Sequence, residues 1–87
     1  MKYLDFWATW CNPCKMMMPI VDKLNESGIP VEKIDIELAD NAHLVQKHSI
    51  RSVPTFVLVD ENGNELEKIV GAKPESVLVE AFEKHKK

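Results

Sequence analysis

The feature that most constrains this chain is a Cys-x-x-Cys sequence near its beginning, which contains both of its cysteines. Cys11 and Cys14 are separated by Asn12 and Pro13. A disulfide that closes so small a ring contributes roughly 2 kcal/mol at most, because entropic stabilisation grows with loop length. A chain with two cysteines that needed a structural bridge would place them far apart. The spacing therefore predicts a dithiol that exchanges electrons.

The residues around the two cysteines favour a reactive thiolate at the first of them. Pro13 fits the first position of a helix, where its missing N–H leaves no hydrogen bond unmade. Cys11 then lies at the helix start, beside free backbone N–H groups and the positive end of the helix dipole. This setting favours the thiolate, the attacking species in disulfide exchange. We expect Cys11 to be the nucleophile, and Cys14, one turn inside and more shielded, to be the resolving thiol.

Hydrophobic patterning and turn residues predict an alternation of strands and helices. An apolar run interrupted only by Asp5 predicts a buried strand over residues 3–8, and a helix from 13 to about 27 follows, kinked at Pro19. Further on, the pattern predicts a strand over 31–38, a short helix over 40–48 capped by Asp40, strands over 55–59 and 65–70 around a type I′ turn at Asn62-Gly63, and a last helix opened by Pro74. The order βαβαββα is typical of an α/β fold.

Several segments resemble those of thioredoxins. They are DFWATWCNPCKM over residues 5–16, Pro19, KID over 33–35, IRSVPT over 50–55 and VGA over 70–72, in the family's order. The resemblance covers essentially the whole chain and implies one thioredoxin-like domain over residues 1–87. It implies the minimal thioredoxin fold, a four-stranded mixed sheet flanked by three helices. Asn12 departs from the family's usual glycine, and the chain begins where the family's second strand begins, which implies a short form without the first strand and helix.

The resemblance also implies roles for residues outside the cysteine pair. The family's matching aspartate lies beneath the disulfide and relays protons to the resolving cysteine, so this role falls to Asp5. The matching lysine, here Lys33, is partly buried beside that aspartate. Burial in the strand would raise the pKa of the Asp5 carboxyl. The alternative is that the strand is shorter and that Asp5 lies at its solvent-exposed end.

The expected substrate surface surrounds the cysteines. The family proline that matches Pro54 is cis and packs against the two sulfurs, so we expect the Val53–Pro54 bond to be cis. Such a bond turns the Val53 backbone toward the site, where an extended substrate segment could pair with it. The residues expected to bind substrate are Trp10, Asn12, Pro13, Val53, Pro54 and Gly71, while Trp7 is expected to pack beneath the site.

These observations predict a thiol–disulfide oxidoreductase that reduces disulfides in partner proteins without a bound cofactor. The resemblance implies a thioredoxin reductase, supplied by NADPH, as the electron donor. Two alternatives remain open: a glutathione-dependent carrier similar to glutaredoxins, and a binding subunit in which the fold is retained without catalysis. An assay of the reduction of a generic protein disulfide with dithiothreitol distinguishes the two oxidoreductase hypotheses from the non-catalytic binding subunit.

Other classes of partner have little support in the sequence. A net charge of −3 gives no electrostatic reason to expect nucleic-acid binding, and no membrane span or signal peptide is visible, so we expect a cytoplasmic protein unless a leader has been removed. The run Met16-Met17-Met18 is expected to fill the core, and we expect no metal site. We expect His43, His48 and His85 at the surface or its boundary. Charges on the strand over 31–38 predict a monomer.

Overall fold

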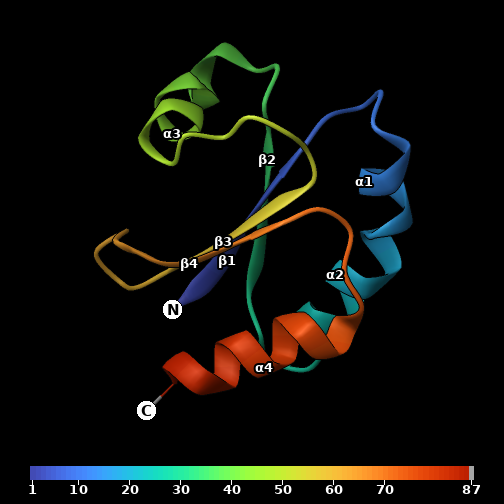
Figure 1. Ribbon diagram of the computed structural model, residues 1–87, viewed down its shortest axis with the longest axis vertical. Coiled ribbons are helices and arrows are strands. Elements are labelled where there is room, and N and C mark those ends of the chain that lie inside the picture. The colour runs from blue at the N-terminus through green and yellow to red at the C-terminus, as the bar shows by residue number, and fades with distance from the viewer. Residues whose placement is uncertain (87) are drawn as a thin grey trace.

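A computed structural model describes residues 1–86 and contains a four-stranded sheet in the order β2-β1-β3-β4. The strands are β1 (Lys2–Trp7), β2 (Val31–Asp35), β3 (Thr55–Val59) and β4 (Glu65–Val70). β1 and β2 are parallel, and β3 is antiparallel to both β1 and β4 (Figure 1). A four-stranded mixed sheet is what the resemblance implied, so the prediction of a thioredoxin fold is confirmed.

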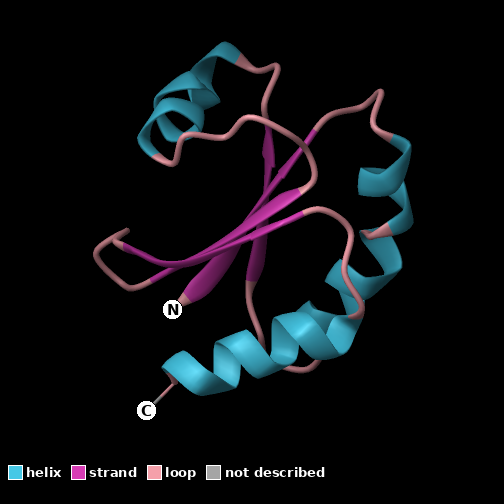
Figure 2. Ribbon diagram, in the orientation of Figure 1, coloured by secondary structure: helices cyan, strands magenta, loops and turns pink. Residues whose placement is uncertain are grey.

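Helices cover both faces of this sheet. They are α1 (Asn12–Met16), α2 (Met18–Glu26), the 3₁₀ helix η1 (Ala39–Asn41), α3 (Ala42–Lys47) and α4 (Glu75–His85). α1, α2 and α4 lie on one side of the sheet, and α3 lies on the other (Figure 2). α1 and α2 follow each other as one broken helix, which gives the three flanking helices expected.

The break between α1 and α2 falls at Met17, two residues before Pro19. Proline has no N–H to donate and its ring clashes with the preceding turn, so it interrupts a helix interior. Met17 is itself buried, with 3% of its surface exposed. The kink therefore turns α2 onto the sheet, while α1 stays at the end of the sheet with the cysteines (Figure 1).

The two faces of the sheet bury separate apolar clusters. The face under α2 and α4 contains Tyr3 and Phe56 from the sheet, Val21 and Leu24 from α2, and Leu78 and Phe82 from α4. The opposite face contains Leu4, Phe6, Val57 and Val59, with Leu44 and Val45 of α3 packed against them. This alternation along β1 and β3 is the two-residue period of a strand that is covered on both sides. The sheet is thereby held rigidly under the loops that carry the chemistry.

β2 ends three residues before the predicted strand does. After Asp35, the Asp35 carboxylate Oδ1 accepts a hydrogen bond from the Glu37 backbone N–H at 2.9 Å, which turns the chain out of the sheet. Leu38, expected in the strand, is 56% exposed. The prediction of a strand to residue 38 was wrong because it did not include this local side-chain turn.

Two other local predictions were wrong. Asp40 does not cap the helix: it lies inside η1, and α3 begins after Asn41, whose side chain donates instead to the Asp35 carbonyl at 2.9 Å. The β3–β4 connection is not a type I′ turn, because only Gly63 has positive φ (82°) there. The Gly63 N–H bonds the Asp60 carbonyl at 3.0 Å, so the turn is centred one residue earlier.

His48 lies in the interior, contrary to the prediction of a surface position. Only 2% of its surface is exposed, and its ring lies 6.0 Å from that of Phe6. Its Nδ1 lies 2.9 Å from Glu65 Oε1, so the partner is a carboxylate at the start of β4. The pair joins the end of α3 to the β3–β4 hairpin.

Candidate redox site

Cys11 and Cys14 form a disulfide at the start of α1, with their Cα atoms 5.3 Å apart. Cys11 is the N-cap of α1 and has an extended backbone, with φ −92° and ψ 105°. The Cys14 backbone N–H donates to Cys11 Sγ at 3.1 Å. An N–H group that the helix itself leaves unpaired thus points at one of the two sulfurs, where it would also stabilise a thiolate.

Burial does not distinguish the two cysteines in this oxidised form. Each is 4% exposed, so the expected extra shielding of Cys14 is not present. With Ala8 they form a small cluster, against which Trp7, Ile36 and Val53 pack. The intervening Asn12 and Pro13 are exposed. The difference between the sulfurs therefore lies in the backbone hydrogen bond and not in solvent access.

Asp5 is a buried carboxylate in the middle of β1. It is 5% exposed, and no described residue donates a hydrogen bond to its Oδ1. Burial raises the pKa of Asp5 from about 3.8 to about 6, and the charge of Lys33 opposes the rise. The alternative of a solvent-exposed Asp5 at the end of a shorter strand is thereby excluded. A carboxyl group with such a pKa exchanges protons near neutral pH.

The strand period places Asp5 on the face of β1 that leads to the cysteines. Tyr3, two residues before it, packs against α2, and Trp7, two residues after it, packs against the disulfide cluster. Lys33 is paired with Asp5 in the parallel register of β1 and β2. Its side chain is exposed and not partly buried as expected, because β2 lies at an edge of the sheet.

The loop before β3 lies next to the cysteines and contains a cis Val53–Pro54 bond, as expected. The Gly71 N–H donates to the Pro54 carbonyl at 2.8 Å, and the Thr55 hydroxyl donates to the Ser52 carbonyl at 2.8 Å. Gly71 has φ 95°, a conformation that residues with a side chain rarely adopt. Pro54 itself is fully buried, whereas Val53 is half-buried.

Trp10 projects from the turn that precedes Cys11 and is 64% exposed. Its indole Nε1 donates to Glu37 Oε2 at 3.1 Å, and Thr9 Oγ1 lies 3.4 Å from Glu37 Oε1. The Glu37 carboxylate, which follows β2, therefore fixes the turn at Thr9 and Trp10 that follows β1. Nothing in the residues around Glu37 indicates that it reaches across two loops, so its contact with Trp10 could not be predicted from the sequence.

A mostly apolar cavity opens beside the disulfide cluster. Trp10 and Val53, both expected to bind substrate, line it together with Ile36, Val45, Ile50, Arg51 and Ser52. Pro54 and Gly71 are not among the lining residues. Arg51 and Ile50 belong to the IRSVPT segment that carried the resemblance, so their place in the sequence was the available signal.

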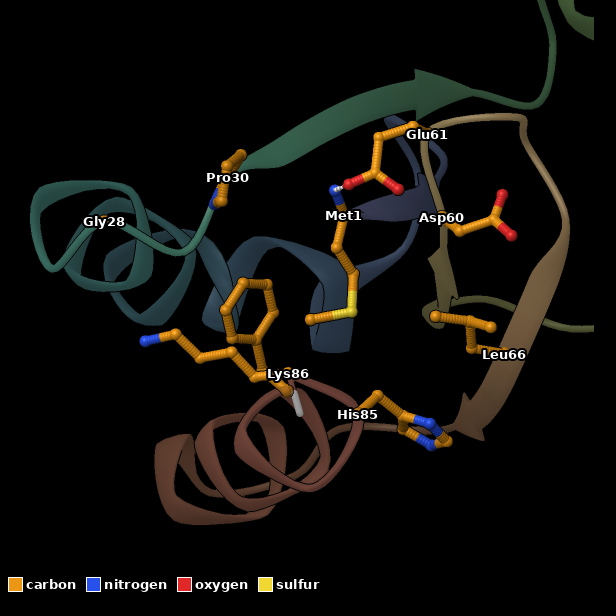
Figure 3. A pocket seen from close by; sticks show the side chains of 9 residues that line it. Met1, Gly28, Pro30, Asp60, Glu61, Leu66, His85 and Lys86 are labelled. Carbon is orange, nitrogen blue, oxygen red and sulfur yellow. Dashed lines mark hydrogen bonds and ion pairs between the residues drawn. The ribbon is translucent and has the colours of Figure 1, made fainter.

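A separate cavity of about 590 Å³ lies near the end of α4, and neither cysteine lines it (Figure 3). Asp60 and Glu61 of the hairpin lie on one side of it, and His85 at the end of α4 and the following Lys86 lie on the other. None of the expected site residues lines this cavity. Of these two cavities, the one beside Trp10 is therefore the candidate for substrate binding.

The remaining sequence candidates lie apart from the site. Met16 and Met18 are 75% and 36% exposed and so do not fill the core as expected, unlike the buried Met17. His43 is exposed, and His85 Nε2 lies 2.9 Å from Glu67 Oε1. Across residues 1–86 no three histidine, cysteine or acidic side chains are grouped closely enough to hold a metal ion. Within the same residues no helix has both the length and the apolar character needed to cross a membrane.

The sequence matches the family model described as Thioredoxin over residues 2–84. Thioredoxins of Staphylococcus epidermidis and Staphylococcus aureus are each 36% identical over an aligned length of 87 residues, and the alignment covers 97% of this chain and 81% of theirs. Among solved structures, a mutant thioredoxin from Halobacterium salinarum superposes with a TM-score of 0.86 at 36% identity, covering 98% of this chain and 74% of that one. Oxidised mitochondrial thioredoxin 3 from Saccharomyces cerevisiae superposes with a TM-score of 0.81 at 32% identity, covering 94% of this chain and 76% of that one.

Proposed function

Because the chain belongs to the thioredoxin family and carries a redox-active cysteine pair, we propose that Cys11 is its attacking thiolate and Cys14 its resolving thiol. The chain is a thiol–disulfide oxidoreductase. The hydrogen bond from the Cys14 N–H to Cys11 Sγ supports the order of attack, because a donor at 3.1 Å stabilises negative charge on that sulfur.

The reaction proceeds in two exchanges. In the reduced protein, the Cys11 thiolate attacks one sulfur of a partner disulfide, and the other partner sulfur leaves as a thiolate that takes up a proton. Cys14 then loses its proton and attacks Cys11 Sγ, which breaks the mixed disulfide and releases the second partner thiol. Two electrons pass to the partner, and the Cys11–Cys14 disulfide remains.

Asp5 is the proposed base for the second exchange. Its carboxyl group, with a pKa of about 6, is mostly ionised at neutral pH and accepts the proton that Cys14 must lose. Its place in β1 between Tyr3 and Trp7 supports this role, since Trp7 packs on the cysteine cluster. Lys33, paired with Asp5 across β1 and β2, is proposed to adjust the acidity of that carboxyl group.

The proposed substrate surface consists of the exposed side chains around the disulfide and the loop beside it. Trp10 and Val53 provide apolar contacts, while Asn12 and Pro13 between the cysteines remain exposed. Pro54 and Gly71 hold the loop by their backbone hydrogen bond, which fixes the position of Val53. A partner segment would bind there in an extended conformation.

Family membership implies disulfide-bearing proteins as substrates and a thioredoxin reductase as a partner. We propose an NADPH-linked reductase as the electron donor and the cytoplasm as the working compartment, because a dithiol of this kind must be returned to its reduced form. We further propose a monomer. Glu32, Lys33 and Asp35 place charge along β2, which disfavours pairing of two copies at that edge.

The order of attack is tested by trapping. Cys14→Ser should accumulate a stable mixed disulfide with a disulfide-bearing partner such as insulin, because the resolving sulfur is absent. Cys11→Ser should accumulate little, since Cys14 lacks the backbone donor. Equal trapping by the two variants, measured by non-reducing electrophoresis and mass spectrometry, would show that the assignment is wrong.

A further inference from the structure

The cavity beside Trp10 continues into a second one along α3. The second cavity is lined by Ala42, Gln46 and Ser49 together with four residues that also line the first: Ile36, Val45, Ile50 and Arg51. The two therefore form one groove, which starts next to Cys11 and extends away from it over α3. We call it the Arg51 groove.

The floor of this groove is fixed by the end of α3. The Ile50 N–H donates to the Val45 carbonyl at 3.0 Å, and the Ser49 N–H donates to the Gln46 carbonyl at 3.1 Å. Ser49 has φ 53°. This is the Schellman ending of a helix, in which the residue after the turn packs on the residue five before it. Ile50 and Val45 are thereby held together as an apolar floor.

The residues that line the groove carry positive charge and no negative charge. Arg51 is the one charged residue that lines either cavity, and its side chain is exposed. Among the described residues Arg51 takes part in no ion pair, whereas Glu37, near the same end of the groove, already accepts hydrogen bonds from Trp10 and Thr9. The protein as a whole is acidic, with a net charge of −3. An unpaired guanidinium beside an apolar floor is a site that a carboxylate would complement.

We propose that Arg51 determines substrate specificity, by selecting partner disulfides whose attacked cysteine is followed by an apolar residue and then an acidic one. The apolar side chain occupies the floor between Trp10, Val45 and Ile50, and the carboxylate meets Arg51. An extended chain advances about 3.3 to 3.6 Å per residue, so both positions lie within a few residues of the attacked cysteine. The inference rests on the proposed function, because it concerns the partner bound during the first exchange.

The test uses three cyclic disulfide peptides that are identical except at one position. Each has leucine directly after one cysteine, and glutamate, glutamine or lysine directly after the leucine. Fully reduced protein is mixed with each peptide under single-turnover conditions, the reaction is stopped with acid, and the second-order rate constant is obtained by chromatography. The measurements are repeated with added salt, which screens exposed charges.

For the unchanged protein we expect the glutamate peptide to react about two- to fivefold faster than the glutamine peptide, and the lysine peptide to react slower by a similar factor. Salt should reduce both ratios. Arg51→Gln should give equal rates for glutamate and glutamine peptides, and Arg51→Glu should reverse the order. Lys23→Gln removes the same charge from an exposed position on α2 outside the groove, and should preserve the order.

The outcomes separate this inference from the proposed function. If the unchanged protein reduces all three peptides at one rate, or if Arg51→Gln retains the preference, then Arg51 does not select substrates although the oxidoreductase assignment stands. If the unchanged protein reduces neither the peptides nor insulin, the proposed function fails and this inference falls with it. Circular dichroism and thermal unfolding of Arg51→Gln, compared with the unchanged protein, show whether the variant is folded.

Discussion

The indole of Trp10 is held by Glu37 through a hydrogen bond of 3.1 Å from Nε1 to Oε2. The side chain of the residue directly before Cys11 is therefore ordered by a residue that follows β2, the strand next to β1. Asp35 fixes Glu37 in turn, by accepting the Glu37 N–H at 2.9 Å. The aromatic surface next to the disulfide thus depends on how β2 ends.

Glu37→Ala should raise KM for protein disulfides about two- to fivefold with little change in kcat, because a freed Trp10 must be ordered on binding. Glu37→Gln retains an acceptor for the indole N–H and should recover most of the affinity. The indole Nε1–H signal of Trp10 in NMR spectra should shift and broaden only in the alanine variant. A loss of kcat instead of KM would assign Glu37 to the chemical step.

Asp5→Asn should stabilise the oxidised protein at pH 8 by about 2 to 3 kcal/mol. The pKa of Asp5 is about 6 when folded and lies near 3.8 when unfolded, so the folded state binds more protons between these values. The wild-type protein therefore loses stability as pH rises from about 4 to above 6, whereas the variant does not. Urea unfolding at pH 4 and pH 8 measures this; a gap that is equal at both pH values would contradict it.

The same Asp5 substitution should slow the resolving exchange. An amide cannot accept the proton that Cys14 loses, so rapid-quench reduction of insulin should show the mixed disulfide persisting at neutral pH. Glu80→Gln, which removes an exposed carboxylate on α4, is the matched control and should leave the rate unchanged. Equal rates for Asp5→Asn and the wild type across pH 6 to 9 would leave Asp5 with no part in the exchange.

Ser49→Gly should stabilise the protein by about 0.5 to 1 kcal/mol. Ser49 is the described non-glycine residue with positive φ, at 53°, and a side chain in this conformation costs about 1 kcal/mol or more. Thermal unfolding measures the gain. Ser27→Gly, at a negative φ of −86°, is the control and should give no gain.

Glu65→Ala should destabilise the protein by about 1 to 3 kcal/mol, because it leaves the buried Nδ1 of His48 without its partner at 2.9 Å. Glu65→Gln offers a carbonyl oxygen in the same place and should cost less. Denaturant unfolding of the two variants measures the difference. An alanine variant as stable as the wild type would mean that His48 is held by packing on Phe6 alone.

Apolar runs and helix-breaking residues predicted the strands, including the buried strand that contains Asp5, and the broken helix at Pro19. The mixed sheet and the cis bond before Pro54 were instead implied by the resemblance. The ends of elements were predicted less well. Asp35 ends β2 and Asn41 precedes α3 through hydrogen bonds that depend on where other segments lie.

Residues that act across the sheet were also missed. His48 is isolated in the sequence, and its partner Glu65 follows seventeen residues later in another element. Glu37 and Trp10 are 27 residues apart. Patterns of hydrophobicity report which face a residue occupies but not which polar atom it meets. Such pairs require the tertiary arrangement.

The break at Met17 separates the segment that carries the reactive cysteines from the segment that packs in the core. α1 carries the reactive sulfurs with the exposed Asn12 and Pro13 between them, whereas α2 contributes Val21 and Leu24 to the interior. Side chains in the small ring can thus be exchanged without repacking the protein. The reduction potential of the cysteine pair and the thermal stability of the protein can therefore be changed independently, by evolution or by design. Substitutions at residues 12 and 13 change the first, and substitutions in the helix beyond the kink change the second.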